Sequence, residues 1–89
     1  MEVLTINSMS THQITIHGYK VSCDDDMANW GLKHLAYFLP EDECRALFKQ
    51  AEDQHEVEFE DNQHRQFTLI KGENYSFVVV ATHVRHGWI

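Results

Sequence analysis

The sequence predicts an α+β fold, in which an antiparallel sheet of four or five strands carries two helices on one face. Three observations lead to this fold class. Residues 55–82 show the two-residue hydrophobic period of short strands, and residues 12–23 show it again on both sides of a glycine. Residues 25–54 contain two runs with apolar side chains at helical spacing. We therefore expect one small domain over residues 1–89, with an N-terminal β-hairpin, two helices and a C-terminal three-strand meander.

The meander in residues 55–82 is the best-patterned part of the chain. In its first strand Val57 and Phe59 alternate with three glutamates. Three-residue turns at residues 62–64 and 72–74 keep the apolar positions of all three strands on one face, because a slip by one residue would turn a strand over. The predicted register places Phe59 opposite Phe67, Val57 opposite Leu69, Leu69 opposite Phe77 and Phe67 opposite Val79.

The opposite face of the meander changes from strand to strand. It carries glutamates on the first strand, then the polar Gln66 and Thr68 with the apolar Ile70 on the second. On the third strand it carries Val78 and Val80. We expect the first strand at a sheet edge, where charge discourages unwanted pairing. The third strand is apolar on both faces, which is typical of a strand with neighbours on both sides.

Residues 12–23 are the candidate neighbour of that third strand. A two-residue turn at His17 and Gly18 would pair Ile16 with Tyr19, and Ile14 with Val21. A bulge at Gly18 is the alternative.

Two helices are expected between the hairpin and the meander. The first covers about residues 25–38, begins at three aspartates that can cap free N–H groups, and ends before Pro40. The second starts after Pro40 with acids in its first turn and stops near Gln54. The predicted core of the domain comprises Ile14, Ile16, Val21, Met27, Trp30, Leu35, Phe38, Leu47, Phe48, Val57, Phe59, Phe67, Leu69, Phe77 and Val79.

The two ends of the chain carry weaker patterns. Residues 1–11 are expected to form a weak strand or a loosely held arm, and residues 83–89 a tail without a clear period. No signal peptide or membrane span is visible in the sequence, so we expect a cytoplasmic protein that does not contact membranes.

The negative charge is concentrated in one segment. Residues 41–61 hold nine acids and two bases, which leaves −7, the formal charge of the whole protein. Such a surface repels nucleic acid and attracts a basic protein partner; the alternative is a solvated face that keeps a small protein in solution. The predicted partner-binding residues are Glu41, Asp42, Glu52, Asp53, Glu56, Glu58, Glu60 and Asp61.

Catalytic and metal chemistry receive less support. Seven histidines are present, and His64 with Arg65, or His83 with His86, could serve a ribonuclease-like enzyme. No zinc-binding spacing of Cys and His occurs, and Cys44 lies on an apolar helix face where burial and preceding acids should raise its pKa. We expect no catalytic residue, no metal and no cofactor.

An uncovered apolar patch on the reverse face of the sheet would favour a homodimer. Its predicted interface residues are Ile70, Val78, Val80 and Trp88. The predicted function is a non-enzymatic protein–protein interaction module, an accessory or inhibitory factor with an acidic face. The alternatives are a small His-dependent enzyme or metal-binding protein, and a structural subunit of a larger assembly.

Overall fold

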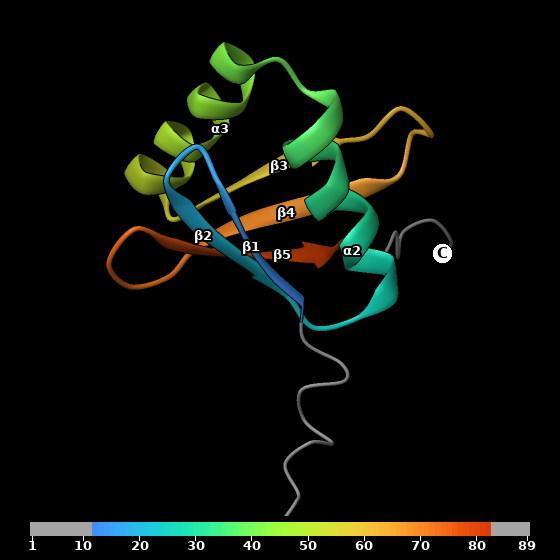
Figure 1. Cartoon of the computed structure of the whole chain (residues 1–89), viewed down its shortest axis with the longest axis horizontal. Helices are drawn as coiled ribbons and strands as arrows, with labels where there is room; N and C mark the ends of the chain where they lie inside the picture. The colour runs from blue at the N-terminus through green and yellow to red at the C-terminus, as the bar shows by residue number, and fades with distance from the viewer. Residues whose placement is uncertain (1–11, 83–89) are drawn as a thin grey trace, which may run out of the picture.

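The computed structural model describes residues 12–82, which form a five-stranded sheet with its helices on one face (Figure 1). The arm and the tail expected at residues 1–11 and 83–89 lie outside the described residues. In chain order the elements are β1 (His12–Ile16), β2 (Tyr19–Cys23), α2 (Asp26–Lys33), η1 (His34–Phe38), α3 (Glu41–Gln54), β3 (Glu56–Glu60), β4 (Gln66–Lys71) and β5 (Ser76–Ala81).

The strands lie in the order β1-β2-β5-β4-β3. The predicted α+β class is confirmed, as are the edge position of β3 and the place of the hairpin beside the last strand of the meander. The sheet is mixed rather than wholly antiparallel, because β2 and β5 run parallel. Parallel neighbours need a long crossover connection, and here the helices and the first two meander strands supply it.

The hairpin turn is the two-residue turn that the sequence predicts. His17 and Gly18 both have positive φ, 50° and 90°, as a type I′ turn requires. Ile16 pairs with Tyr19 and Ile14 with Val21, so the register of β1 and β2 is confirmed.

The meander register is confirmed on one side and wrong on the other. Val57 pairs with Leu69 and Phe59 with Phe67, across a turn at residues 62–64. Between β4 and β5, however, Leu69 pairs with Val79 and Phe67 with Ala81, a shift of two residues. The turn there is longer than predicted: Asn74 and Tyr75 have positive φ, and the Gly72 N–H donates to the Ser76 carbonyl at 2.7 Å. A shift of two keeps each side chain on its predicted face.

The helices begin and end close to the predicted positions. The Asp25 side chain caps α2 by accepting a hydrogen bond of 2.7 Å from the Ala28 N–H. After Lys33 the helix continues as a π-helical turn, η1, up to the extended Leu39. Helix α3 follows Pro40 and ends at His55, which is left-handed with φ 76°.

The core lies between the sheet and the helices, but α2 presents a different face from the predicted one. Met27, Trp30 and Phe38 are 49%, 48% and 64% exposed, so their assignment to the core is wrong. Ala28, Gly31 and Leu32 are buried instead, together with Leu35, whose assignment to the core is confirmed. The remaining predicted core residues are buried or packed against the core, and Cys44 and Ala51 of α3 join them.

A close approach of helix and sheet explains the change of face. A Cβ atom added to Gly31 would lie 2.7 Å from two ring atoms of Phe67, which is itself fully buried. The backbone of α2 therefore lies nearer the sheet than any large side chain would allow. Helix α2 packs on β5 and β4, with Ala28 and Gly31 buried, and its side chains Met27 and Trp30 remain half-exposed.

Candidate functional site

The predicted acidic residues border one edge of the molecule. Helix α3 packs on β3 and β4, so its acids lie on the helix side of the sheet, whereas Glu56, Glu58 and Glu60 project from the opposite face of the edge strand β3. Six of the eight predicted residues are exposed, Glu52 is half-buried, and Asp61 is buried and is described separately below. We call the other seven residues the acidic rim: Glu41, Asp42, Glu52, Asp53, Glu56, Glu58 and Glu60.

Two members of the rim have a basic partner. Glu41 Oε2 accepts a hydrogen bond of 2.8 Å from Arg45 Nε, and this bond holds the pKa of Glu41 below its usual value. Glu60 Oε2 lies 2.6 Å from Nδ1 of His64. Arg45 therefore offsets part of the rim's charge, and the other acids of the rim carry the rest.

Asp61 is separate from the acidic rim, because its side chain is only 4% exposed. It accepts hydrogen bonds from the Gln63 and Arg65 N–H groups, both at 2.9 Å, and from Arg65 Nε at 2.7 Å. Burial raises the pKa of Asp61, but the bonds from Arg65 and Gln63 outweigh it and leave the pKa below its usual value. Asp61 organises the β3–β4 turn rather than presenting charge.

The predicted dimer residues lie on the reverse face of the sheet, opposite the helices. Ile70 pairs with Val78 across β4 and β5, and Val80 is paired with Thr68 on the same face. Val80 is 37% exposed, and Ile70 and Val78 are half-buried. The fourth predicted residue, Trp88, lies outside the described residues.

The thiol of Cys44 lies in the core, and burial raises its pKa as the sequence predicts. Cys44 is fully buried, its Sγ donates to the Leu35 carbonyl at 3.5 Å, and its pKa is raised to about 11. Among residues 12–82, no group of three or more His, Cys, Asp or Glu side chains could hold a metal ion. His64 and Arg65 are each bonded to a different carboxylate, and His83 and His86 lie outside the described residues.

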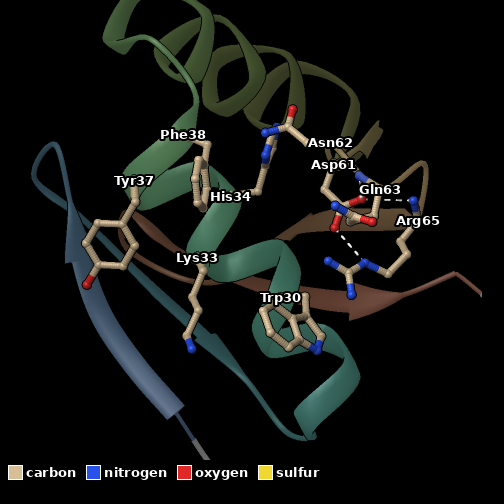
Figure 2. Close-up of a pocket in the computed structure, with 9 residues that line it drawn as sticks. All are labelled: Trp30, Lys33, His34, Tyr37, Phe38, Asp61, Asn62, Gln63 and Arg65. Atoms are coloured by element: carbon tan, nitrogen blue, oxygen red, sulfur yellow. Dashed lines mark hydrogen bonds and ion pairs between the residues drawn. The ribbon is translucent and has the colours of Figure 1, made fainter.

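A cavity of about 530 Å³ opens between α2–η1 and the β3–β4 turn (Figure 2). One side comes from the helical segment and the other from the turn that Asp61 organises. The lining residues are Trp30, Lys33, His34, Tyr37, Phe38, Asp61, Asn62, Gln63 and Arg65.

Two cationic side chains and several aromatic rings lie around this cavity. The guanidinium carbon of Arg65 lies 4.7 Å from the centre of the Trp30 ring, and Nζ of Lys33 lies 5.2 Å from it. His34, only 7% exposed, lies nearly parallel to Phe38 and Phe59, with ring centres 6.2 and 6.3 Å away. Figure 2 shows the Arg65 side chain reaching from the turn toward Trp30 on the helix.

Sequence reasoning missed the cavity because it assigned Trp30 and Phe38 to the core. The signal that could have found it is a second stripe on the same helix, Ala28, Gly31 and Leu32, which has helical spacing with Leu35, a residue already assigned to the core. Choosing that stripe as the buried one leaves Trp30 and Phe38 exposed.

Comparison of the chain with protein-family models, with curated proteins and with solved structures found no match. The function must therefore be inferred from the residues and their arrangement. None of the helices between residues 12 and 82 has the length and apolar character needed to cross a membrane.

Proposed function

We propose that this protein is a non-enzymatic interaction module that presents its acidic rim to a basic protein partner, as an accessory or inhibitory factor of the cytoplasm. The observation that carries the proposal is the placement of the rim. Six of its seven acids are exposed, and they border a single edge of the molecule at β3 and α3.

The charge of the rim suits a basic partner rather than nucleic acid. Binding to nucleic acid depends on Lys and Arg side chains that neutralise phosphates, whereas the carboxylates of the rim would repel the phosphates. A basic surface would instead be attracted before contact, which raises its association rate and suppresses wrong partners.

The edge strand adds a second reason to place the partner here. In the described sheet β3 has a neighbour, β4, on one side only. Its outer side offers backbone N–H and C=O groups beside Glu56, Glu58 and Glu60. The glutamates discourage a second copy from pairing at this edge, while an extended basic segment would be compatible with it.

The proposal is tested by capture of partners from cell extract with the purified protein, with and without about 0.5 M salt. The double variant Glu56→Lys plus Glu58→Lys should lose the salt-sensitive partners. Asp24→Lys plus Glu73→Lys is the matched control, because it makes the same change of charge at exposed acids outside the rim.

Three results would contradict the proposal. Partners could survive the salt unchanged, they could remain bound to the rim variant, or they could be lost equally from the rim variant and the control. The last result would mean that only the total charge matters and that the rim has no specific role.

A further inference from the structure

We propose that the cavity between α2–η1 and the β3–β4 turn binds a small planar anion, that is, an aromatic or heteroaromatic ring that carries a carboxylate or phosphate group. This inference does not depend on the acidic rim. The cavity volume of about 530 Å³ falls within the range of small-molecule sites in proteins.

The first argument is the exposure of aromatic side chains around the cavity. Trp30, Tyr37 and Phe38 are 48%, 71% and 64% exposed, and all three line it. Large aromatic groups that remain in contact with water offer flat apolar surfaces on which a ligand ring can stack. Two of them lie on the π-helical turn η1, and such turns are frequent at functional sites.

The second argument is the pair of cations beside Trp30. Asp61 holds Arg65 through its Nε atom, which fixes the guanidinium over the Trp30 ring and leaves its outer N–H groups on the cavity side. Lys33 approaches the same ring. An anionic group could therefore receive a two-point hydrogen bond from Arg65 and a further contact from Lys33, while the attached ring stacks on the aromatic side chains.

The third argument is His34, which is 93% buried and lines the cavity. Within residues 12–82 its ring nitrogens have no hydrogen-bond partner. Phe38 and Phe59 lie nearly parallel to the imidazole, so its polar edge is the part left for bonding. Buried polar groups are normally bonded, and a heteroatom or hydroxyl of the ligand would supply the missing partner.

A polynucleotide is a poorer occupant than a small molecule. The chain has a formal charge of −7, and a long polyanion would meet the acidic rim as well as the two cavity cations. A small anion would meet Arg65 and Lys33 together with one lining carboxylate, Asp61, which is already bonded to Arg65. The proposal therefore commits to a free small molecule.

The test is calorimetric titration of the full chain with adenosine monophosphate and with indole-3-acetate, which combine a planar ring with a phosphate or a carboxylate. We expect at least one to bind with a dissociation constant of about 1 mM or tighter. Adenosine and inorganic phosphate each carry one half of this chemistry and should bind at least about tenfold more weakly. The probe that binds shows which combination of ring and anionic group the cavity accepts. If neither binds, or if only an oligonucleotide does, the proposal is wrong.

Variants locate the bound probe. Trp30→Leu should weaken binding about fivefold or more by removing the stacking surface. Lys33→Ala should weaken it about twofold to fivefold, whereas Lys49→Ala, an equal loss of charge on the exposed side of α3, should not. Binding that is unchanged in both Trp30→Leu and Lys33→Ala would place the probe elsewhere and overturn the proposal.

His34→Phe separates a binding role from a packing role. Phenylalanine can keep the stacking on Phe38 and Phe59 but cannot form a hydrogen bond. We expect weaker binding together with thermal stability that is unchanged or higher, since an unsatisfied buried polar group is removed. Unchanged binding in a folded His34→Phe variant would mean that His34 only packs, and it would remove the third argument.

Discussion

At the scale of single residues, Asp61 shows how a charged side chain can serve structure alone. Its carboxylate accepts hydrogen bonds from two backbone N–H groups and from the Arg65 guanidinium within one turn. The sequence places it among the acids of residues 41–61, and nothing in its local composition separates it from Glu60. Only the fold of the turn around it decides that it is buried.

The hydrogen bonds to Asp61 predict a pH dependence of stability. Because its pKa is lower in the folded chain, Asp61 stabilises the fold above its unfolded pKa of about 3.9, and this contribution is lost as the pH falls through the folded pKa. Asp61→Asn should be less stable than wild type at neutral pH, by about 1–3 kcal/mol. The difference should shrink on acidification below about pH 4.

Urea denaturation at several pH values measures this effect. Asp53→Asn makes the same chemical change at an exposed position of α3 and is the control. Parallel pH profiles for wild type and Asp61→Asn would contradict the assignment.

At the scale of elements, the packing of α2 on the sheet depends on the absence of a side chain at Gly31. Gly31→Ala would favour the helix by about 1 kcal/mol through its backbone propensity. The new methyl group, however, would lie 2.7 Å from the ring of Phe67, which is fully buried. We expect a net loss of about 1–3 kcal/mol in the free energy of unfolding.

Chemical denaturation tests the packing of α2, with Gln50→Ala on the exposed side of α3 as a control that should change little. A Gly31→Ala protein as stable as wild type, or more so, would mean that helix and sheet are not in such close contact.

The same element shows why hydrophobic spacing alone chose the wrong face. Met27, Trp30 and Phe38 have the larger side chains and would bury the most area if they faced the core, so the sequence favours their stripe. The neighbouring stripe through Gly31 has less area but lets the two backbones approach, and backbone approach is a property of the pair of elements.

At the scale of the whole molecule, the reverse face of the sheet predicts self-association. Ile70, Val78 and Val80 lie together on it, and both helices cover the other face. We propose that two copies pack through this patch and expect a dimer at micromolar concentration in sedimentation velocity. Val80→Lys should shift the protein to a monomer, because it places a charge within the patch.

Thr15→Lys is the matched control for the dimer. It adds the same charge to the same face at the far edge strand β1, and it should leave the dimer intact. A wild-type protein that sediments as a monomer, or equal effects of both substitutions, would count against the interface.

Features that depend on neighbours along the chain can be predicted from the amino-acid sequence. The strands, the hairpin turn at His17 and Gly18, the ends of both helices and the β3–β4 register follow from local spacing, caps and turn residues. The concentration of acids in residues 41–61 is equally visible there.

The features that join distant segments depend on tertiary packing. These are the parallel direction of β2 and β5, the buried face of α2, and the cavity between Trp30 and Arg65. The two-residue shift between β4 and β5 is different, because it comes from a local turn that is longer than predicted. Each of the other three features depends on how closely residues that are far apart in the sequence can approach in space. The close approach of Gly31 to the Phe67 ring is an example. Periodicity within one segment carries no information about such distances, so these features are set by how the segments pack together.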